Sequence, residues 1–375
     1  MLFFRPGLHF RIILTLLWIT STENLQAGTQ SDSSSRNLPE GLKIAAYLDL
    51  YAGSFAPYTK GGSVPYFVNM NRNRELAVNL CMLDFNYENK RIRARLAPGF
   101  GTYMNSNYAA EPGSLASLVE ANAGFCLFPE RKIWLDAGVL GSPYSSEGFL
   151  SRDQHLYSRS LAPEYVPYYL SGIKLSIPLS KCINLYIYGL NGWQQIRDKN
   201  QYPAIGTQLE YLGKRSRLNW NTFAGDERDV LAGEKGRMQR MRWFTDVYWI
   251  YNPEGKVSAT ACAYAGIQEY AAGWNSGKAI WWQLNGSLRY RLSEKNSFSA
   301  RLEYFSDPNA AVIEPVFGSK GFNTGSGSLC WNYNLSSNAT FRFEGRQFLS
   351  SESLFGDGKN GRQATWLLAG LTFWL

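Results

Sequence analysis

The sequence predicts an all-β protein, built as one transmembrane, antiparallel, up-and-down β-barrel of about 16 strands. Three observations predict this fold. From Leu42 onward apolar and polar residues alternate with a period of two, short polar turns recur along the chain, and longer connections separate these turns in strict alternation. Barrels of the bacterial outer membrane have short periplasmic turns and long outer loops, whereas a soluble sandwich has no reason to segregate them.

The composition agrees with a single large barrel. The chain has 375 residues, of which 45% are hydrophobic and 15% aromatic, so it is too apolar to be disordered. Its mean hydropathy is −0.28 and it lacks the apolar runs of about 20 residues that helical membrane proteins need. Lys and Arg exceed Asp and Glu by 38 to 30, but they are scattered, so no nucleic-acid partner is predicted.

The N-terminus predicts export. Arg5 and Arg11 precede or flank a short apolar run at 12–19, and a small residue, Ala27, ends the segment. This is the pattern of a secretory signal peptide over residues 1–27, and the run is too short for a membrane anchor. Residues 28–41 are rich in Ser and form a predicted flexible leader, so the barrel is predicted over residues 42–375.

The turns give the strand count. Seven four-residue turn clusters recur every 35–49 residues and end at Arg91, Lys132, Lys181, Ser216, Gly255, Asn296 and Ser337. Eight longer connections, rich in Gly, Pro, Asn and Ser, are expected at 56–72, 104–117, 141–166, 193–202, 226–239, 269–278, 307–321 and 350–363. Each interval between short turns holds two strands, which gives eight hairpins with both chain ends on the short-turn side.

The strand faces predict lipid outside and water within. In the first strand Ile44, Leu48 and Leu50 alternate with Tyr47 and Asp49. Lipid offers no partner to backbone amides, so strands that cross it must close into a cylinder. Aromatic residues near the short turns predict a girdle at one rim: Tyr87, Tyr211, Tyr251, Tyr290, Phe298, Tyr333 and Phe341.

The C-terminal segment ends on an apolar face. Leu367, Ala369, Leu371, Phe373 and Leu375 alternate with other residues along it. This ending resembles the signal that the outer-membrane assembly machinery recognises, although that signal usually ends in an aromatic residue. We expect this machinery and outer-membrane lipid to be partners of the chain. Whether the barrel forms homo-oligomers is left open.

Several segments, in this order, resemble the OmpL-like β-barrel porin family. The segments are Tyr47–Tyr51, Asn71–Glu75, Tyr108–Gly113, Ile133–Gly138, Asn191–Gln194, Gly206–Leu209 and Phe343–Arg346. The resemblance spans most of the predicted exported chain. It implies an outer-membrane pore of a Gram-negative-type cell, with no defined substrate.

A barrel of 16 strands is wide enough to hold a water-filled lumen, so the expected function is passive diffusion of small hydrophilic solutes. The longest connection, 141–166, is the third long loop and resembles in position the constriction loop of general porins; it carries Glu147, Asp153 and Glu164. The predicted pore-lining residues are Arg93, Arg95, Arg289, Arg291, Arg301, Arg342, Arg346, Asp49, Glu120 and Asp136.

Two interpretations of these charges stay open. An arginine wall opposed by loop carboxylates would create a transverse field that favours small dipolar or anionic solutes. Alternatively, the arginines pair with wall carboxylates and select nothing. The candidate partners are Asp49, Glu120, Asp136, Glu210, Asp246, Glu303 and Glu344.

An enzyme is not predicted. The chain has only two histidines, and its five cysteines lie at least 45 residues apart, so we predict no catalytic residue, metal site or cofactor. His155 has Ser151, Asp153 and Ser158 nearby, which suggests a catalytic triad. Residues so close in one loop more often lack the triad geometry.

The alternative function is a rigid platform whose outer loops bind a partner, a glycan or a host surface without conducting. Tyr residues suit adaptable binding loops, and the predicted loops hold Tyr58, Tyr66, Tyr103, Tyr108, Tyr144, Tyr157 and Tyr165. These side chains could equally pack a loop into the mouth of the barrel. A soluble exported β-propeller is a third, weaker alternative.

Overall fold

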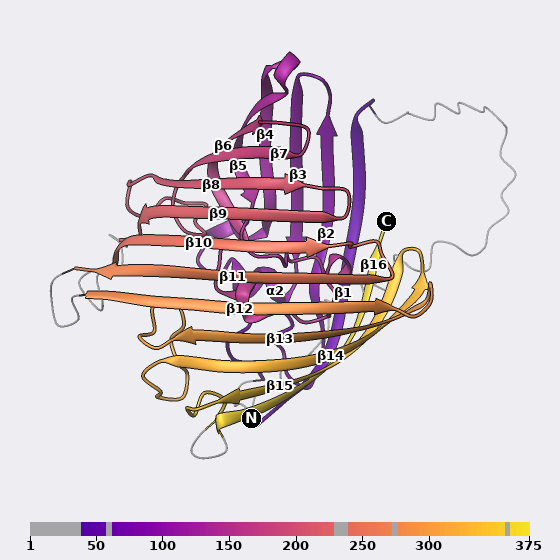
Figure 1. The fold of residues 1–375 in the computed structure, drawn as a ribbon, viewed down its shortest axis with the longest axis vertical. Coiled ribbons are helices and arrows are strands. Elements are labelled where there is room, and N and C mark those ends of the chain that lie inside the picture. The colour runs from indigo at the N-terminus through magenta and orange to yellow at the C-terminus, as the bar shows by residue number, and fades with distance from the viewer. Residues whose placement is uncertain (1–38, 58–61, 229–238, 272–276, 357–360) are drawn as a thin grey trace, which may run out of the picture. The chain divides into compact units, whose positions relative to one another are not determined.

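The described part of the chain forms a closed barrel of sixteen antiparallel strands, each paired with its neighbours in sequence (Figure 1). β1 closes the barrel by pairing with β16. The strands are β1 Leu42–Ala56, β2 Leu76–Glu88, β3 Ile92–Phe100, β4 Leu118–Phe128, β5 Ile133–Gly141, β6 Tyr169–Pro178, β7 Ile183–Leu190, β8 Ala204–Leu212, β9 Ser216–Asp226, β10 Gln239–Tyr251, β11 Val257–Tyr270, β12 Gly277–Arg291, β13 Asn296–Asp307, β14 Phe322–Ser336, β15 Ala339–Ser350 and β16 Gln363–Trp374. The predicted fold class and strand count are confirmed, and a β-propeller is excluded.

This computed structural model describes residues 39–57, 62–228, 239–271, 277–356 and 361–375. The predicted signal peptide at 1–27 and nearly all of the leader at 28–41 lie outside the described residues. The barrel unit itself extends from Gly41 to Leu375. β1, the first strand of this unit, begins at Leu42.

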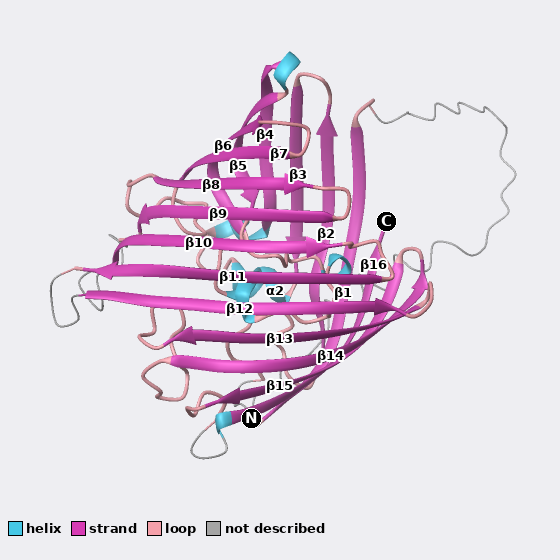
Figure 2. Ribbon diagram, in the orientation of Figure 1, coloured by secondary structure: helices cyan, strands magenta, loops and turns pink. Residues whose placement is uncertain are grey.

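Short turns and long loops alternate around the barrel as predicted. A typical short turn joins β10 to β11, where Asn252 adopts a left-handed φ of 46° that asparagine tolerates, and Gly255 donates its N–H to the Asn252 carbonyl. Strands dominate the described residues (Figure 2), and the α-helical turns are short: α2 spans Thr102–Asn107 and α3 spans Leu161–Glu164. Both lie in long loops. No helix within the described ranges is long and apolar enough to cross a membrane.

The strands are polar inside and apolar outside, the reverse of a soluble protein. In β13, Arg301 and Glu303 face inward and are buried, whereas Leu302 between them is 74% exposed on the outer wall. Tyr290 and Phe298 near the short turns are also exposed on the outside. This arrangement suits a wall that contacts lipid, because apolar side chains there are not transferred into water.

Much of the barrel interior is packed with side chains. An apolar cluster joins inward residues of the strands, such as Phe348 and Trp366, to residues of the first and third long loops, such as Phe67 and Leu161. A second cluster packs Tyr103 and Met104 of α2 against β2 and β3. Sixteen strands alone predict a wide bore, but the loops occupy part of it.

Candidate functional site in the barrel lumen

The third long loop, residues 142–168 between β5 and β6, lies inside the barrel. Its backbone and side chains bond inward-facing groups on distant strands: the Ser145 amide donates to Asp246 Oδ2 on β10 at 2.6 Å, and the Leu161 amide donates to Glu303 Oε2 on β13 at 2.6 Å. The Ala162 carbonyl accepts from the Tyr264 hydroxyl on β11 at 3.1 Å. A loop fixed to so many strands must cross the lumen.

Asp49 on β1 anchors the middle of this loop. Its carboxylate accepts from the Tyr157 hydroxyl at 2.8 Å and from the Ser151 hydroxyl at 2.7 Å. It also accepts from Asn79 Nδ2 on β2 at 3.1 Å and from the Thr372 hydroxyl on β16 at 3.3 Å. Asp49 is completely buried. Four hydrogen-bond donors thus stabilise its charge.

A charged cluster, which we call the paired cluster, fixes the loop to β13 and β15. It consists of Glu147, Arg301, Glu303, Glu344 and Arg346. Arg301 lies 3.3 Å from Glu147 and 3.4 Å from Glu344, and Arg346 forms an ion pair with Glu303. Every strand member of the cluster is buried. Burial is tolerated here because each charge meets an opposite charge.

Arg342 on β15 holds the loop differently. Its guanidinium donates to the carbonyls of Ser151, Arg152 and Leu156. Arg159 inside the loop likewise donates to backbone carbonyls, including that of Phe149 at 2.8 Å. These arginines therefore order the loop backbone without a carboxylate partner among the described ion pairs.

A separate group of ion pairs lines β2 to β5. Arg93 on β3 donates twice to Asp136 on β5, with its Nε 2.6 Å from Oδ1. Arg95 lies 2.8 Å from Asp84 and 2.5 Å from Glu120. For these residues the geometry matches the interpretation in which arginine and wall carboxylate pair. Whether they line a permeation path stays a prediction.

The three loop carboxylates do not act together. Glu147 joins the paired cluster, but Glu164 accepts from the Val68 amide at 2.6 Å and from Asn69 Nδ2 at 2.9 Å in the first long loop. Burial raises the pKa of Glu164. Asp153 contacts the adjacent Arg152 at 3.4 Å and has an exposed side chain. The structure therefore brings only Glu147 to the arginines of β13 and β15.

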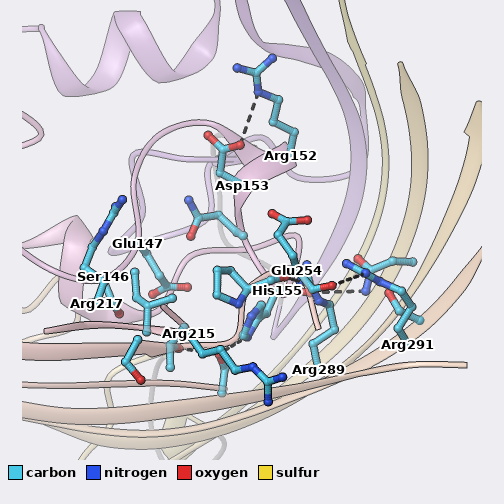
Figure 3. A pocket seen from close by; sticks show the side chains of 18 of the residues that line it. Ser146, Glu147, Arg152, Asp153, His155, Arg215, Arg217, Glu254, Arg289 and Arg291 are labelled. Atoms are coloured by element: carbon cyan, nitrogen blue, oxygen red, sulfur yellow. Dashed lines mark hydrogen bonds and ion pairs between the residues drawn. The ribbon is translucent and has the colours of Figure 1, made fainter. Parts of the chain in front are cut away.

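A polar cavity of about 760 Å³ lies on the short-turn side of the third loop (Figure 3). The loop, the turns after β8 and β10, and the ends of β12 to β15 form its walls. Seven basic residues line it: Arg152, Lys214, Arg215, Arg217, Arg289, Arg291 and Arg342. Three acidic residues oppose them: Glu147, Asp153 and Glu254. The cavity lining therefore has four more basic than acidic residues.

His155 is part of this cavity wall and does not form the suggested triad. Its Nδ1 bonds the Ser287 hydroxyl on β12 at 2.8 Å, and its Nε2 bonds the Ser258 hydroxyl on β11 at 2.8 Å. Burial first, then the nearby Arg289 and Arg342, lowers the pKa of His155 to about 3. The ring is therefore neutral at pH 7 and serves as a structural contact between the loop and the wall.

Several lumen residues escape prediction from the sequence. The pattern does not identify Ser258, Ser287 or Asn332 as partners of the loop, although Asn332 Nδ2 donates to the His155 carbonyl at 3.3 Å. The period-two phase could have placed them on the inner face, because each shares that face with a named arginine of its own or a neighbouring strand. It could not have said which loop residue each one meets.

The family comparison decides which class of barrel this is. A family model described as putative β-barrel porin-2, OmpL-like, matches residues 41–375. The chain belongs to this family. The porin thus has the family that its segments suggested, and the outer membrane is its location. None of the curated proteins compared with the porin matches it.

Solved structures of other outer-membrane channels share the fold of the porin. The channel DcaP of Acinetobacter baumannii is 10% identical with a TM-score of 0.59, over 88% of this chain and 97% of that one. The anion-selective porin from Comamonas acidovorans is 9% identical with a TM-score of 0.58, over 89% and 99%. OmpT of Vibrio cholerae is 9% identical with a TM-score of 0.56, over 89% and 97%. At these identities the likeness concerns the fold alone.

Proposed function

We propose that this porin lets small hydrophilic solutes diffuse passively across the outer membrane and that it favours anions. The observation that carries the preference is the charge of the cavity below the third loop, where seven basic residues face three acidic ones. A water-filled space between low-dielectric walls concentrates the field of such charges and raises the local concentration of the opposite ion. The third loop, held across the lumen, would set the narrowest part of the path.

The similarity to an anion-selective porin supports this proposal only through the shared fold. The stronger support is local. Arg289, Arg291 and Arg342 contribute charge that no carboxylate within ion-pair distance neutralises among the described residues. In the paired cluster and in the ion pairs of β2 to β5, in contrast, every arginine has a carboxylate partner. We therefore assign the preference to the cavity arginines rather than to Arg93 and Arg95.

The alternative function, a platform that binds a partner through its outer loops, was suggested by the tyrosines predicted in those loops. Tyr103, Tyr108, Tyr144 and Tyr157 are buried inside the protein rather than displayed on the outer loops, and Tyr58 lies outside the described residues. Their hydroxyls and rings bond other parts of the barrel, as in the stacked pair of Tyr103 and Phe149. The four buried tyrosines instead fit the interpretation in which these side chains pack a loop into the mouth of the barrel.

The test is the reversal potential of single channels in a planar bilayer under a tenfold salt gradient. We expect ohmic conductance steps and a potential of the sign for anion preference. Replacing Arg289, Arg291 and Arg342 together by Gln should reduce the anion-to-cation permeability ratio several-fold, since one nearby charge is worth about 1 kcal/mol in water. Lys278→Gln, at the long-loop end of β12, is the matched control. An unaltered ratio in the triple variant, or cation preference in the unmodified barrel, would contradict the anion proposal, and absence of steps would contradict the pore.

A further inference from the structure

Three arginines at the short-turn end of the barrel form a group of their own, which we call the rim arginines: Arg289, Arg291 and Arg342. Each donates to backbone carbonyls: Arg291 Nη1 to Glu254 at 2.8 Å, Arg289 to Pro253, and Arg342 to the third loop. Within the described residues, no carboxylate lies at ion-pair distance from any of them. A guanidinium has five N–H donors, so these bonds leave donors available to a ligand.

The strand register places this group in a row. Arg291 on β12 is opposite Ser297 on β13, Ser297 is opposite Asn332 on β14, and Asn332 is opposite Arg342 on β15. Neighbouring strands are about 4.8 Å apart, so the two arginine backbones at the ends of the row are separated by about 14 Å. Arg289 lies two residues deeper on the inner face of β12. The row thus has cationic ends and an uncharged, hydrogen-bonding centre.

The row faces a space large enough for a solute. All five residues line the cavity of about 760 Å³, with Asn334 and Thr340 beside them. The Nε atoms of Arg289 and Arg342 are buried and have no hydrogen-bond partner among the residues that the structure describes. Buried donors are almost always satisfied, so an acceptor that enters the cavity would complete the bonding of this wall.

We infer that this row is a binding site for a small solute with two anionic groups, either carboxylates or phosphates. A guanidinium binds such groups with charge-assisted, often bidentate hydrogen bonds. One anionic group would meet Arg342, the other would meet Arg291 with Arg289, and Ser297 and Asn332 lie between the two ends. The inference deepens the proposed function and rests on it, because the solute reaches the row through the pore.

The experiment is direct binding to the refolded barrel in detergent by isothermal titration calorimetry. The probes are glutarate, pyrophosphate and acetate. We expect saturable binding of one or both dianions, and acetate should bind roughly tenfold more weakly because it forgoes the charge-assisted contacts at one end. The dianion that binds more tightly identifies the anionic group that the site prefers. Saturation by neither dianion, or equal binding of acetate, would overturn the inference.

Matched variants separate a site from a merely positive cavity. Arg291→Gln and Arg342→Gln should each weaken dianion binding roughly tenfold and bring it close to that of acetate. Lys214→Gln removes the same charge from the same cavity, but in the turn between β8 and β9, and should change the affinity less than twofold. An equal loss in Lys214→Gln would overturn the inference. Since Arg342 also holds the loop, Arg291→Gln keeps the test valid if Arg342→Gln does not fold.

Failure of the two proposals would look different. A barrel that conducts anions but shows no saturable binding would remove the site and leave the porin function. A barrel that binds glutarate or pyrophosphate in detergent but gives no conductance steps would remove the porin function and leave the site. The heat-induced mobility shift of each variant on a gel confirms that the barrel has folded before either measurement.

Discussion

Arg342 and Arg346 lie four residues apart on the inner face of β15, yet they have different surroundings. Arg346 belongs to the paired cluster: it forms an ion pair with Glu303 and lies over the rings of Phe348 and Phe67 at 4.4 and 4.9 Å. Arg342 belongs to the rim arginines and bonds only backbone carbonyls of the loop. On the same strand, Arg346 thus has a carboxylate partner, whereas Arg342 lies in the wall of the cavity without one among the described residues.

The neighbouring groups explain the difference, since both side chains are buried, with Arg342 5% and Arg346 1% exposed. At the level of Arg346 the third loop and aromatic side chains exclude water, and an isolated charge there would cost several kcal/mol. Carboxylates from β13 and the loop remove that cost. At the level of the rim arginines the wall borders the polar cavity, and backbone carbonyls accept hydrogen bonds from the guanidinium groups. Paired arginine thus ties the loop to the wall, and we propose that the arginines without a carboxylate partner attract solutes.

The largest effect on stability is expected from Arg346→Met, which removes the arginine of the comparison that has a carboxylate partner. The variant keeps most of the side-chain volume but leaves Glu303 without its nearest cation, so the free energy of unfolding should fall by about 3–5 kcal/mol. Urea unfolding of the barrel in thin phospholipid vesicles measures the change. Adding Glu303→Gln should restore part of the loss, because the two residues interact directly. A loss below about 1 kcal/mol would show that the pair does not support the loop.

An intermediate effect is expected from pH, because His155 contacts both the loop and the wall beside the rim arginines. Its pKa of about 3 in the folded protein lies below the ordinary 6.5, so the unfolded chain binds the proton first as the pH falls. The contribution of the neutral ring to stability is present above pH 6.5 and is lost progressively towards pH 3. Between pH 7 and pH 5.5 the loss should be about 1 kcal/mol.

The control for this pH effect is His155→Gln. Glutamine does not titrate, so the difference in unfolding free energy between variant and unmodified barrel should shrink by about 1 kcal/mol when the pH falls from 7 to 5.5. A difference that is the same at both pH values would mean that the ring does not stay neutral in the folded lumen.

The smallest effect on stability is expected when a rim arginine is replaced. Arg291→Met should lower the free energy of unfolding by less than about 1 kcal/mol, since Arg291 is partly exposed and has one carbonyl partner. The same urea titration measures it. A cost comparable with that of Arg346→Met would show that rim arginines also hold the fold together.

The barrel could be predicted from local sequence because its causes are local. Residues such as Asn252 and Gly255 mark the short turns in the sequence. The period-two pattern around Leu302 arises because one face of each strand contacts lipid and the other contacts polar groups. The same period-two pattern places Arg301 and Arg346 on the inner face of the strands. These features need no knowledge of which strand or loop lies across the lumen.

The partners of the lumen charges could not be predicted in this way. Glu147 and Arg301 are 154 residues apart, and Asp49 and Tyr157 are 108 apart, so only the path of the third loop brings them together. That path depends on the sum of many long-range hydrogen bonds. The sequence therefore left open whether the arginines are neutralised. Among the described residues, Arg301 and Arg346 have carboxylate partners, whereas Arg342 has none at ion-pair distance.

The position of Asp49 links two events that would otherwise be independent. It lies on the first strand, beside the seam where that strand meets the last one, and it accepts hydrogen bonds from Thr372 on the last strand and Tyr157 on the loop. Pairing of β1 with β16 and attachment of the third loop to the barrel wall therefore involve the same carboxylate. Until β1 and β16 have paired, the Asp49 carboxylate lacks the donor that Thr372 supplies, so closure of the barrel completes the anchor of the loop.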